Sequence, residues 1–157
     1  MIRSMTAADK APVMDLVRAT GFFRPDEVTV AEELIDIYLG QPDQKDYGIV
    51  VSVDESGRVA GYMTFGPTPL TVGTYDLYWM AVDPRAQGRG HGRALVEWLE
   101  AHVKAAGGRL IIIETSSVPK YEPTRRFYLG LNYPEVARIP DFYQPGDDRV
   151  IYRKVIG

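Results

Sequence analysis

Residues 83–95, DPRAQGRGHGRAL, place three glycines at alternate positions among three arginines, directly after the strand-like pattern of residues 74–82. The residues that follow have helical spacing of apolar side chains. A turn from strand to helix gathers free backbone N–H groups at the positive end of the helix dipole, where phosphate oxygens bind. Glycines there let an anion approach the backbone, and the arginines add positive charge. The stretch predicts a phosphate-binding turn; the alternative is a turn that simply requires glycines.

The spacing of the glycines separates the classes of phosphate ligand. A dinucleotide loop requires Gly-x-Gly-x-x-Gly, whereas this chain has Gly-x-Gly-x-Gly at Gly88, Gly90 and Gly92. A P-loop requires Gly-Lys-Ser/Thr, which does not follow here. Neither nucleotide-binding class fits.

The patterns on both sides of the loop predict one α/β domain over residues 1–157. We expect a short strand at 2–5, a helix at 9–21 capped by Asp9, a helix at 27–40, and a hairpin at 47–66. The strand at 74–82, a helix to about 106 and the strand at 109–117 read as one right-handed βαβ unit with parallel strands. Four consecutive apolar residues, 110–113, predict burial of that last strand on both faces. A short helix at 123–131 and strands at 133–139 and 149–155 complete the chain.

Each of the first two helices has a predicted inward face. In the first, Val13, Leu16 and Val17 have the spacing of one buried side. In the second, the predicted inward residues are Val30, Leu34, Ile37 and Tyr38, with Gly40 as the stop signal.

Composition excludes several classes of function. With 18 Lys+Arg against 21 Asp+Glu the net charge is −3, so binding of nucleic acid by general phosphate attraction is not expected. The chain has no Cys and therefore no disulfide and no thiolate nucleophile. No stretch has the apolar length of a membrane span or a signal peptide, and we expect a cytoplasmic protein without membrane contact.

Metal and serine-hydrolase chemistry are also not expected. His91 and His102 are eleven residues apart, which on a helix is about 16 Å and too far for one metal ion. The chain has no Gly-x-Ser-x-Gly elbow.

Gln87, Gly90 and Gly92, directly after the strand end MAVDP, fit the pattern Gln-x-x-Gly-x-Gly. The pattern resembles the acyl-CoA-binding motif of the GNAT superfamily, the GCN-type N-acetyltransferases, and the order of elements is similar over nearly the whole chain. The resemblance implies an α/β (α+β) GNAT fold. This fold has a mixed, mostly antiparallel seven-stranded sheet with splayed central parallel strands and about four helices.

The resemblance also implies acetyl-CoA as co-substrate, with no metal, and a set of residues that bind it. The pyrophosphate contacts fall on Gln87, Gly88, Arg89, Gly90, His91 and Gly92, and the pantetheine contacts on Met80, Ala81 and Val82. The segment TRRFYLGLNY resembles the one in which a tyrosine lies beside the CoA sulfur, which implies that Tyr128 is the general acid and Thr124 a cofactor contact. The family often has asparagine and alanine where this chain has Tyr121 and Thr124. The alternative for Tyr128 is a core position on a short amphipathic helix.

Two carboxylates are candidates for groups that act on or contact the acceptor amine. Alternation along residues 74–82 places Asp76, Tyr78, Met80 and Val82 on one face. Asp76 lies four residues before Met80, where some relatives have a glutamate general base; the alternative is that it only ends a turn begun at Gly73. Glu114 ends an apolar strand, where it either contacts the amine or caps the next helix.

Acceptor-binding residues are expected on three segments. Asp141, Phe142 and Tyr143 are predicted to form a loop that, with Asp76 and Glu114, makes an acidic mouth for a cationic amine; the alternative is a solvated hairpin with a Pro-Gly turn. Phe22 and Phe23 either line a pocket or pack beneath the domain, and Tyr78 is expected on the acceptor side.

The predicted function is direct transfer of acetyl from acetyl-CoA to a primary amine of a small molecule or amino acid. The alternatives are acetylation of a protein N-terminal α-amine, or a non-catalytic acyl-CoA-binding module. The protein is expected to be a monomer or a homodimer.

Overall fold

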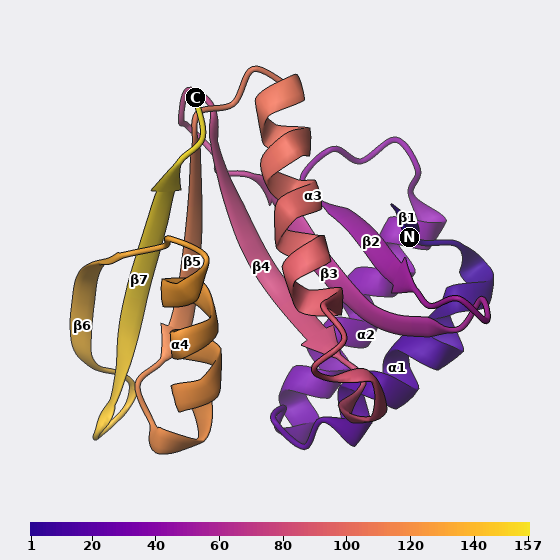
Figure 1. Ribbon diagram of the computed structural model, residues 1–157, viewed down its shortest axis with the longest axis horizontal. Coiled ribbons are helices and arrows are strands. Elements are labelled where there is room, and N and C mark those ends of the chain that lie inside the picture. The colour runs from indigo at the N-terminus through magenta and orange to yellow at the C-terminus, as the bar shows by residue number, and fades with distance from the viewer. The chain divides into compact units, whose positions relative to one another are not determined.

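The computed structural model describes all residues, 1–157 (Figure 1). Seven strands form one sheet in the order β1-β2-β3-β4-β5-β7-β6, and four α-helices accompany them. The strands are β1 Ile2–Ser4, β2 Gly48–Val53, β3 Val59–Pro67, β4 Thr74–Val82, β5 Leu110–Ser116, β6 Glu135–Gln144 and β7 Asp147–Val155. The helices are α1 Lys10–Ala19, α2 Pro25–Gly40, α3 His91–Ala105 and α4 Glu122–Gly130. None of the helices combines the length and apolar character needed to cross a membrane.

The central strands β4 and β5 are parallel, whereas the pairs β1–β2, β2–β3, β5–β7 and β6–β7 are antiparallel. Thr74–Leu77 pair with Leu110–Ile113, so the paired segment covers only the first part of each strand. The predicted mixed, mostly antiparallel seven-stranded sheet and the predicted βαβ order are confirmed.

The chain divides into two compact units. The first unit comprises Met1–Gly66 and Trp79–Leu99, and the second comprises Pro67–Tyr78 and Glu100–Gly157. The glycine-rich loop therefore belongs to the first unit, whereas α4 and strands β5 to β7 belong to the second.

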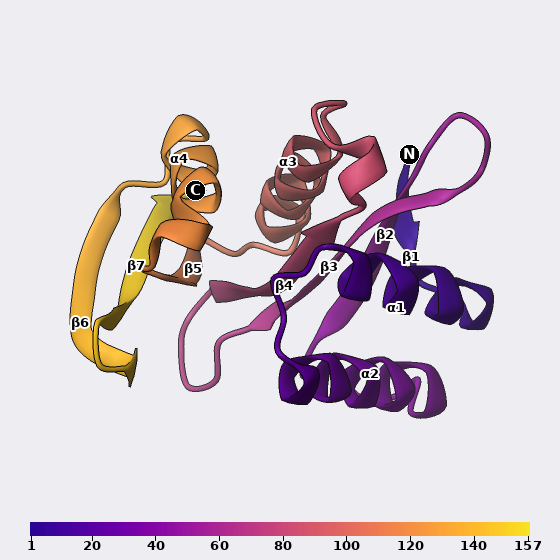
Figure 2. The same ribbon diagram turned by 90° about the horizontal axis from the view of Figure 1, so that it is seen from below.

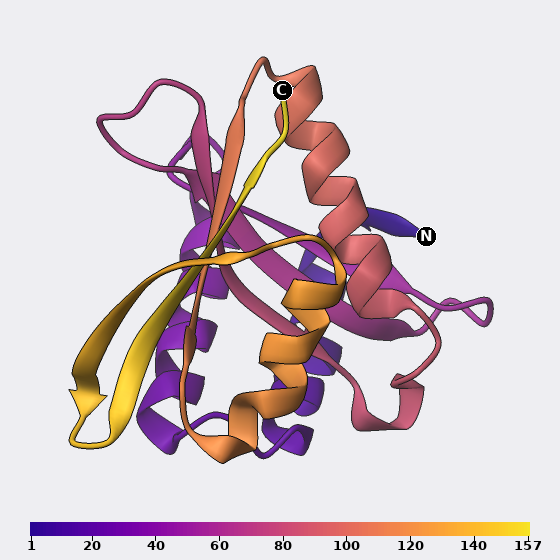
Figure 3. The same cartoon turned by 60° about the vertical axis from the view of Figure 1, so that its left-hand side comes forward.

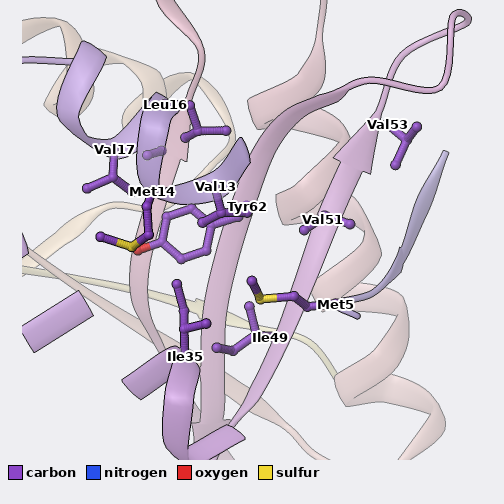
Figure 4. Close-up of a cluster of buried hydrophobic side chains, with 11 residues drawn as sticks. Met5, Val13, Met14, Leu16, Val17, Ile35, Ile49, Val51, Val53 and Tyr62 are labelled. Carbon is purple, nitrogen blue, oxygen red and sulfur yellow. The ribbon is translucent and has the colours of Figure 1, made fainter. Parts of the chain in front are cut away.

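In the first unit, α1 and α2 cover one face of β2 and β3, and the beginning of α3 lies on the other face (Figure 2). The apolar side chains between the helices and the strands form one buried cluster (Figure 4). Its largest fully buried members include Tyr62, Leu16, Ile35 and Ile49. Residues of α1, α2, β2 and β3 thus share a core with Ala81 near the end of β4, the strand that leads to the loop.

The inward face of α1 is confirmed, whereas that of α2 is confirmed only in part: Tyr38 packs against the core cluster. Val13, Leu16 and Val17 are at most 1% exposed. In α2 the buried residues are Ala31 and Ile35, whereas Val30 and Ile37 are 43% and 40% exposed. The apolar spacing of α2 has two possible stripes, and the packing against α1 and β2 selects the one with the smaller Ala31.

The beginning of α1 also differs in detail from the prediction. Asp9 holds the cap position, but its side chain makes no cap hydrogen bond to α1. Its carboxylate instead accepts hydrogen bonds from Thr6 and from the Arg3 guanidinium, at 2.7 Å for both the Thr6 backbone N–H and Arg3 Nη1. These bonds lower the pKa of Asp9 below its usual range and tie β1 to the helix start.

In the second unit, α4 packs on one face of β5 and β7 (Figures 2 and 3). The ring of Tyr128 lies 6.2 Å from that of Tyr152 on β7 and 6.4 Å from that of Tyr133. In β5 burial alternates: Ile111 and Ile113 are buried and Ile112 is half-buried, so the expected burial on both faces is only partly met.

The prediction of a loop at residues 141–143 is wrong, because these residues lie on β6. The pairing of β6 with β7 is irregular between Ile139 and Gln144, and Asp141 has a φ of 55°. The Asp141 carboxylate accepts the N–H of Gly146 at 2.8 Å, which closes the Pro-Gly turn of the hairpin. The structure therefore matches the alternative prediction, a solvated hairpin with a Pro-Gly turn, and every residue of β6 is exposed.

Candidate functional site

The glycine-rich loop joins β4 to the first residue of α3 within the first unit. At the start of the loop, the backbone N–H of Asp83 donates a hydrogen bond to the carbonyl of Ala60 at 2.8 Å. This bond attaches the end of β4 to β3. Gly88 and Gly90 have φ values of 78° and 85°, a left-handed conformation that side-chain-bearing residues rarely adopt. No atom lies within 4 Å of the Cβ position at either glycine. The loop is therefore open above its backbone.

The start of α3 presents free backbone N–H groups next to the loop. The backbone N–H of Ala94 bonds the carbonyl of Gly90 at 2.9 Å, so the helix has its first turn directly after the loop. The N–H groups ahead of that turn have no partner within a helix. The open backbone and the helix start together fit a pyrophosphate.

The three arginines of the loop region have different roles. Arg85 pairs with the buried Asp83 at 2.8 Å, and this hydrogen bond lowers the pKa of the Asp83 carboxyl. Arg93 pairs with Glu97 at 2.8 Å on the helix surface. Arg89 has neither an ion pair nor a hydrogen bond and is exposed. Of the three charges, only that of Arg89 is uncompensated.

His91, the first residue of α3, is held by a residue that the sequence reasoning missed. The hydroxyl of Ser52 on β2, 1% exposed, lies 2.8 Å from Nδ1 of His91. A single serine inside the apolar strand GIVVSV was the available signal, because a buried hydroxyl requires a partner.

The remaining first-unit candidates lie on β4 and in the α1–α2 connection. Met80, Ala81 and Val82 are the last residues of β4, and Ala81 is buried. Phe23 is half-buried, packs against the core cluster and lies 5.3 Å from the Trp79 ring, as the core interpretation predicts. Phe22 is half-buried as well.

The second unit contains Tyr128 in a cluster of tyrosines. Tyr128 is 5% exposed, and burial raises its pKa above the usual range, so the hydroxyl stays protonated through neutral pH. Thr124 lies one turn earlier on α4 and is half-buried, on the same side of the helix as Tyr128.

The second unit also contains the three carboxylates that the sequence predicts near the acceptor, and they differ in their partners. Asp76 accepts a hydrogen bond from the hydroxyl of Thr68 at 2.6 Å. Glu114 forms an ion pair with Arg149. Asp141 is used in the β6–β7 turn. The expected acidic mouth of three free carboxylates is therefore reduced, and Asp76 is bonded only to a neutral hydroxyl of the β3–β4 connection.

Arg149 and the aromatic residues of β6 lie together. The Arg149 guanidinium carbon is 4.8 Å from the centre of the Phe142 ring, and the Phe142 and Tyr143 rings are 5.0 Å apart. Tyr143 and Tyr78 are 46% and 43% exposed. Arg149 was missed from sequence, although its alternation with Ile151 and Arg153 marked a common strand face.

Comparisons with known proteins identify the family of the chain. The model of the acetyltransferase (GNAT) family matches residues 14–133. A GNAT-family structure from Desulfovibrio desulfuricans is 42% identical, with a TM-score of 0.92, covering 100% of this chain and 99% of its own. A comparison with curated proteins found no match.

Two more distant structures share the fold. An aminoglycoside 6'-N-acetyltransferase complexed with coenzyme A is 20% identical, with a TM-score of 0.78 and coverage of 100% of this chain and 97% of the other. The ribosomal-protein-S18-alanine N-acetyltransferase of Escherichia coli is 20% identical, with a TM-score of 0.77 and coverage of 100% and 94%. By the family match and the 42% identical structure, the chain belongs to the GNAT family of acetyltransferases.

Proposed function

We propose that the protein is an acetyl-CoA-dependent N-acetyltransferase that transfers acetyl directly to a primary amine of a small molecule or amino acid. The observation that carries the proposal is the open backbone at Gly88 and Gly90 before the start of α3. The coenzyme A complex of a structural relative supports the same ligand.

The loop would bind the pyrophosphate through its backbone N–H groups from Gln87 to Gly92 and through Arg89, the uncompensated cation. Met80, Ala81 and Val82 would supply the strand edge for the pantetheine arm. His91 adds a ring nitrogen to this set, because Ser52 contacts only Nδ1.

The reaction forms a bond between the amine nitrogen and the acetyl carbonyl carbon, and it breaks the carbon–sulfur bond of the thioester. Acetyl-CoA supplies the activated acyl group. Asp76 accepts the proton that the amine nitrogen loses, directly or through a water. Tyr128 donates its hydroxyl proton to the departing sulfur.

Two measurements test the proposal. Calorimetry with CoA should show binding, and a thiol-release screen over amino acids, polyamines, aminoglycosides and peptides should show turnover with a small amine. The absence of CoA binding would refute the proposal. Binding without turnover or hydrolysis above background would support a non-catalytic module, and turnover only with peptides would support acetylation of protein N-termini.

A further inference from the structure

One face of the second unit's sheet has no helix of that unit on it. α4 lies on the other face, where Tyr128 packs against Tyr152, and Glu100 near the end of α3 pairs with Lys154 at 2.6 Å there. Side chains alternate along each strand, and residues paired across strands point to the same side. The helix-free side, here called the open face, contains Asp76, Tyr78, Ile112, Glu114, Arg149, Ile151 and Arg153.

The strand register places a carboxylate and a guanidinium in one row of the open face. Asp76 on β4 pairs with Ile112 on β5, and Ile112 pairs with Arg153 on β7. Asp76 and Arg153 are therefore two strand spacings apart, about 10 Å between backbones. The half-buried Ile112 lies between them.

The charges at the two ends of this row are not compensated within the protein. The structure shows no ion pair for Asp76, whose carboxylate bonds the neutral hydroxyl of Thr68. Arg153 is exposed, and its guanidinium has no hydrogen bond or ion pair. Glu114 and Arg149, in the neighbouring rows, neutralise each other.

An uncompensated carboxylate and guanidinium on either side of an apolar residue match a ligand with both an amine and a carboxylate. Arg binds carboxylates through two parallel N–H donors. Asp76 is the proposed base for the acceptor amine, so this inference rests on the proposed function.

We propose that the acceptor is an amino acid, whose carboxylate binds Arg153 while its amine lies at Asp76 and its hydrocarbon part contacts Ile112. Arg153 thereby distinguishes amino acids from amines that lack the acid group. Its role is binding, and it takes no part in the proton transfers.

Matched acceptor pairs that differ only in the carboxylate test the inference: L-lysine with cadaverine, L-phenylalanine with phenethylamine, and L-methionine with 3-methylthiopropylamine. The wild type should favour the amino acid of a reactive pair by about tenfold or more in kcat/KM, the effect of one charge-assisted contact. Arg153→Ala should remove this preference by raising KM for the amino acid, with kcat/KM for the plain amine unchanged. Arg153→Lys should restore part of the preference.

Arg126→Ala is the matched control, because Arg126 is an exposed arginine of the same unit that pairs with Glu122 on α4. The control should leave the preference as in the wild type, and thermal unfolding of all variants checks folding. The inference is overturned if the wild type favours the plain amine, or if the preference survives in Arg153→Ala.

Amino-acid binding to the CoA-loaded protein, measured by calorimetry, gives a second readout. Arg153-dependent binding of an amino acid supports the inference even without turnover, a result that would refute only the proposed activity. CoA binding with neither amino-acid binding nor carboxylate preference overturns the inference while leaving the acetyl-CoA proposal intact.

Discussion

The hydroxyl of Ser52 lies 2.8 Å from Nδ1 of His91 and joins the buried strand β2 to the first residue of α3. When the serine donates to Nδ1, the proton of the neutral ring is on Nε2, which can then donate to an anion. Ser52 thus positions the ring and selects a donor at the edge of the loop.

We expect Ser52→Ala to weaken CoA binding about threefold to tenfold, the worth of one hydrogen bond, because His91 loses its orientation. Calorimetric titration with CoA measures this change. Ser4→Ala, at an exposed strand position, is the control and should bind CoA as the wild type does. An unchanged Kd in Ser52→Ala would show that the contact has no role in binding.

Gly90→Ala should lower CoA affinity by about tenfold or more, because a methyl group would occupy the space through which the pyrophosphate approaches the backbone. The substitution should also cost about 1–2 kcal/mol of stability at a φ of 85°.

Gly57→Ala separates the two effects. Gly57 has a φ of 84° in the β2–β3 turn and equally open space around its Cβ position. The Gly57→Ala variant should lose a similar free energy of unfolding, measured with denaturant, but retain the wild-type Kd for CoA. Equal loss of affinity in both variants would contradict the assignment of the loop.

Tyr128→Phe should lower kcat about 100-fold with nearly unchanged CoA affinity, because the ring packing is kept and only the acidic proton is lost. Tyr152→Phe removes a hydroxyl from the same tyrosine cluster and should have little effect on kcat. Thiol-release kinetics and CoA titration of both variants provide the comparison. Wild-type turnover in Tyr128→Phe would show that Tyr128 is only a core residue.

The backbone conformation of the loop could be predicted from the sequence, because glycine at residues 88 and 90 permits the positive φ values directly. The strands and helices around it were also readable from apolar periodicity. The inward face of α2 could be predicted only in part, because Val30 and Ala31 start two stripes of similar spacing and only the packing chooses between them.

The environment of each charged group was the least predictable part. Alternation places Asp76 and Glu114 on strands but does not predict their partners. Thr68 lies in the connection just before β4, and Arg149 comes from β7, a segment distant in the chain. The loop predicted at residues 141–143 is instead part of β6, because an irregular pairing extends the strand up to the Pro-Gly turn.

The Arg3–Asp9 pair gives stability that depends on pH. The pair lowers the folded-state pKa of Asp9 below the unfolded value of about 3.9. Its contribution is therefore fully present above the unfolded pKa and is lost as the pH falls through the folded pKa.

Asp9→Asn should cost about 1–2 kcal/mol at pH 7, and the difference from the wild type should shrink as the pH falls below about 4. Urea unfolding of both proteins between pH 7 and pH 3 measures this. A difference that is constant with pH would show that the Asp9 charge does not contribute.

The two carboxylates of the open face should contribute unequally to catalysis. Asp76→Asn removes the proposed base and should lower kcat/KM about 100-fold. Glu114→Gln should lower it less than about tenfold, because the Glu114 charge is already compensated by Arg149. Both substitutions keep the side-chain shape, so kinetics with one amine acceptor compare the charges alone. A larger loss in Glu114→Gln than in Asp76→Asn would move the base from β4 to β5.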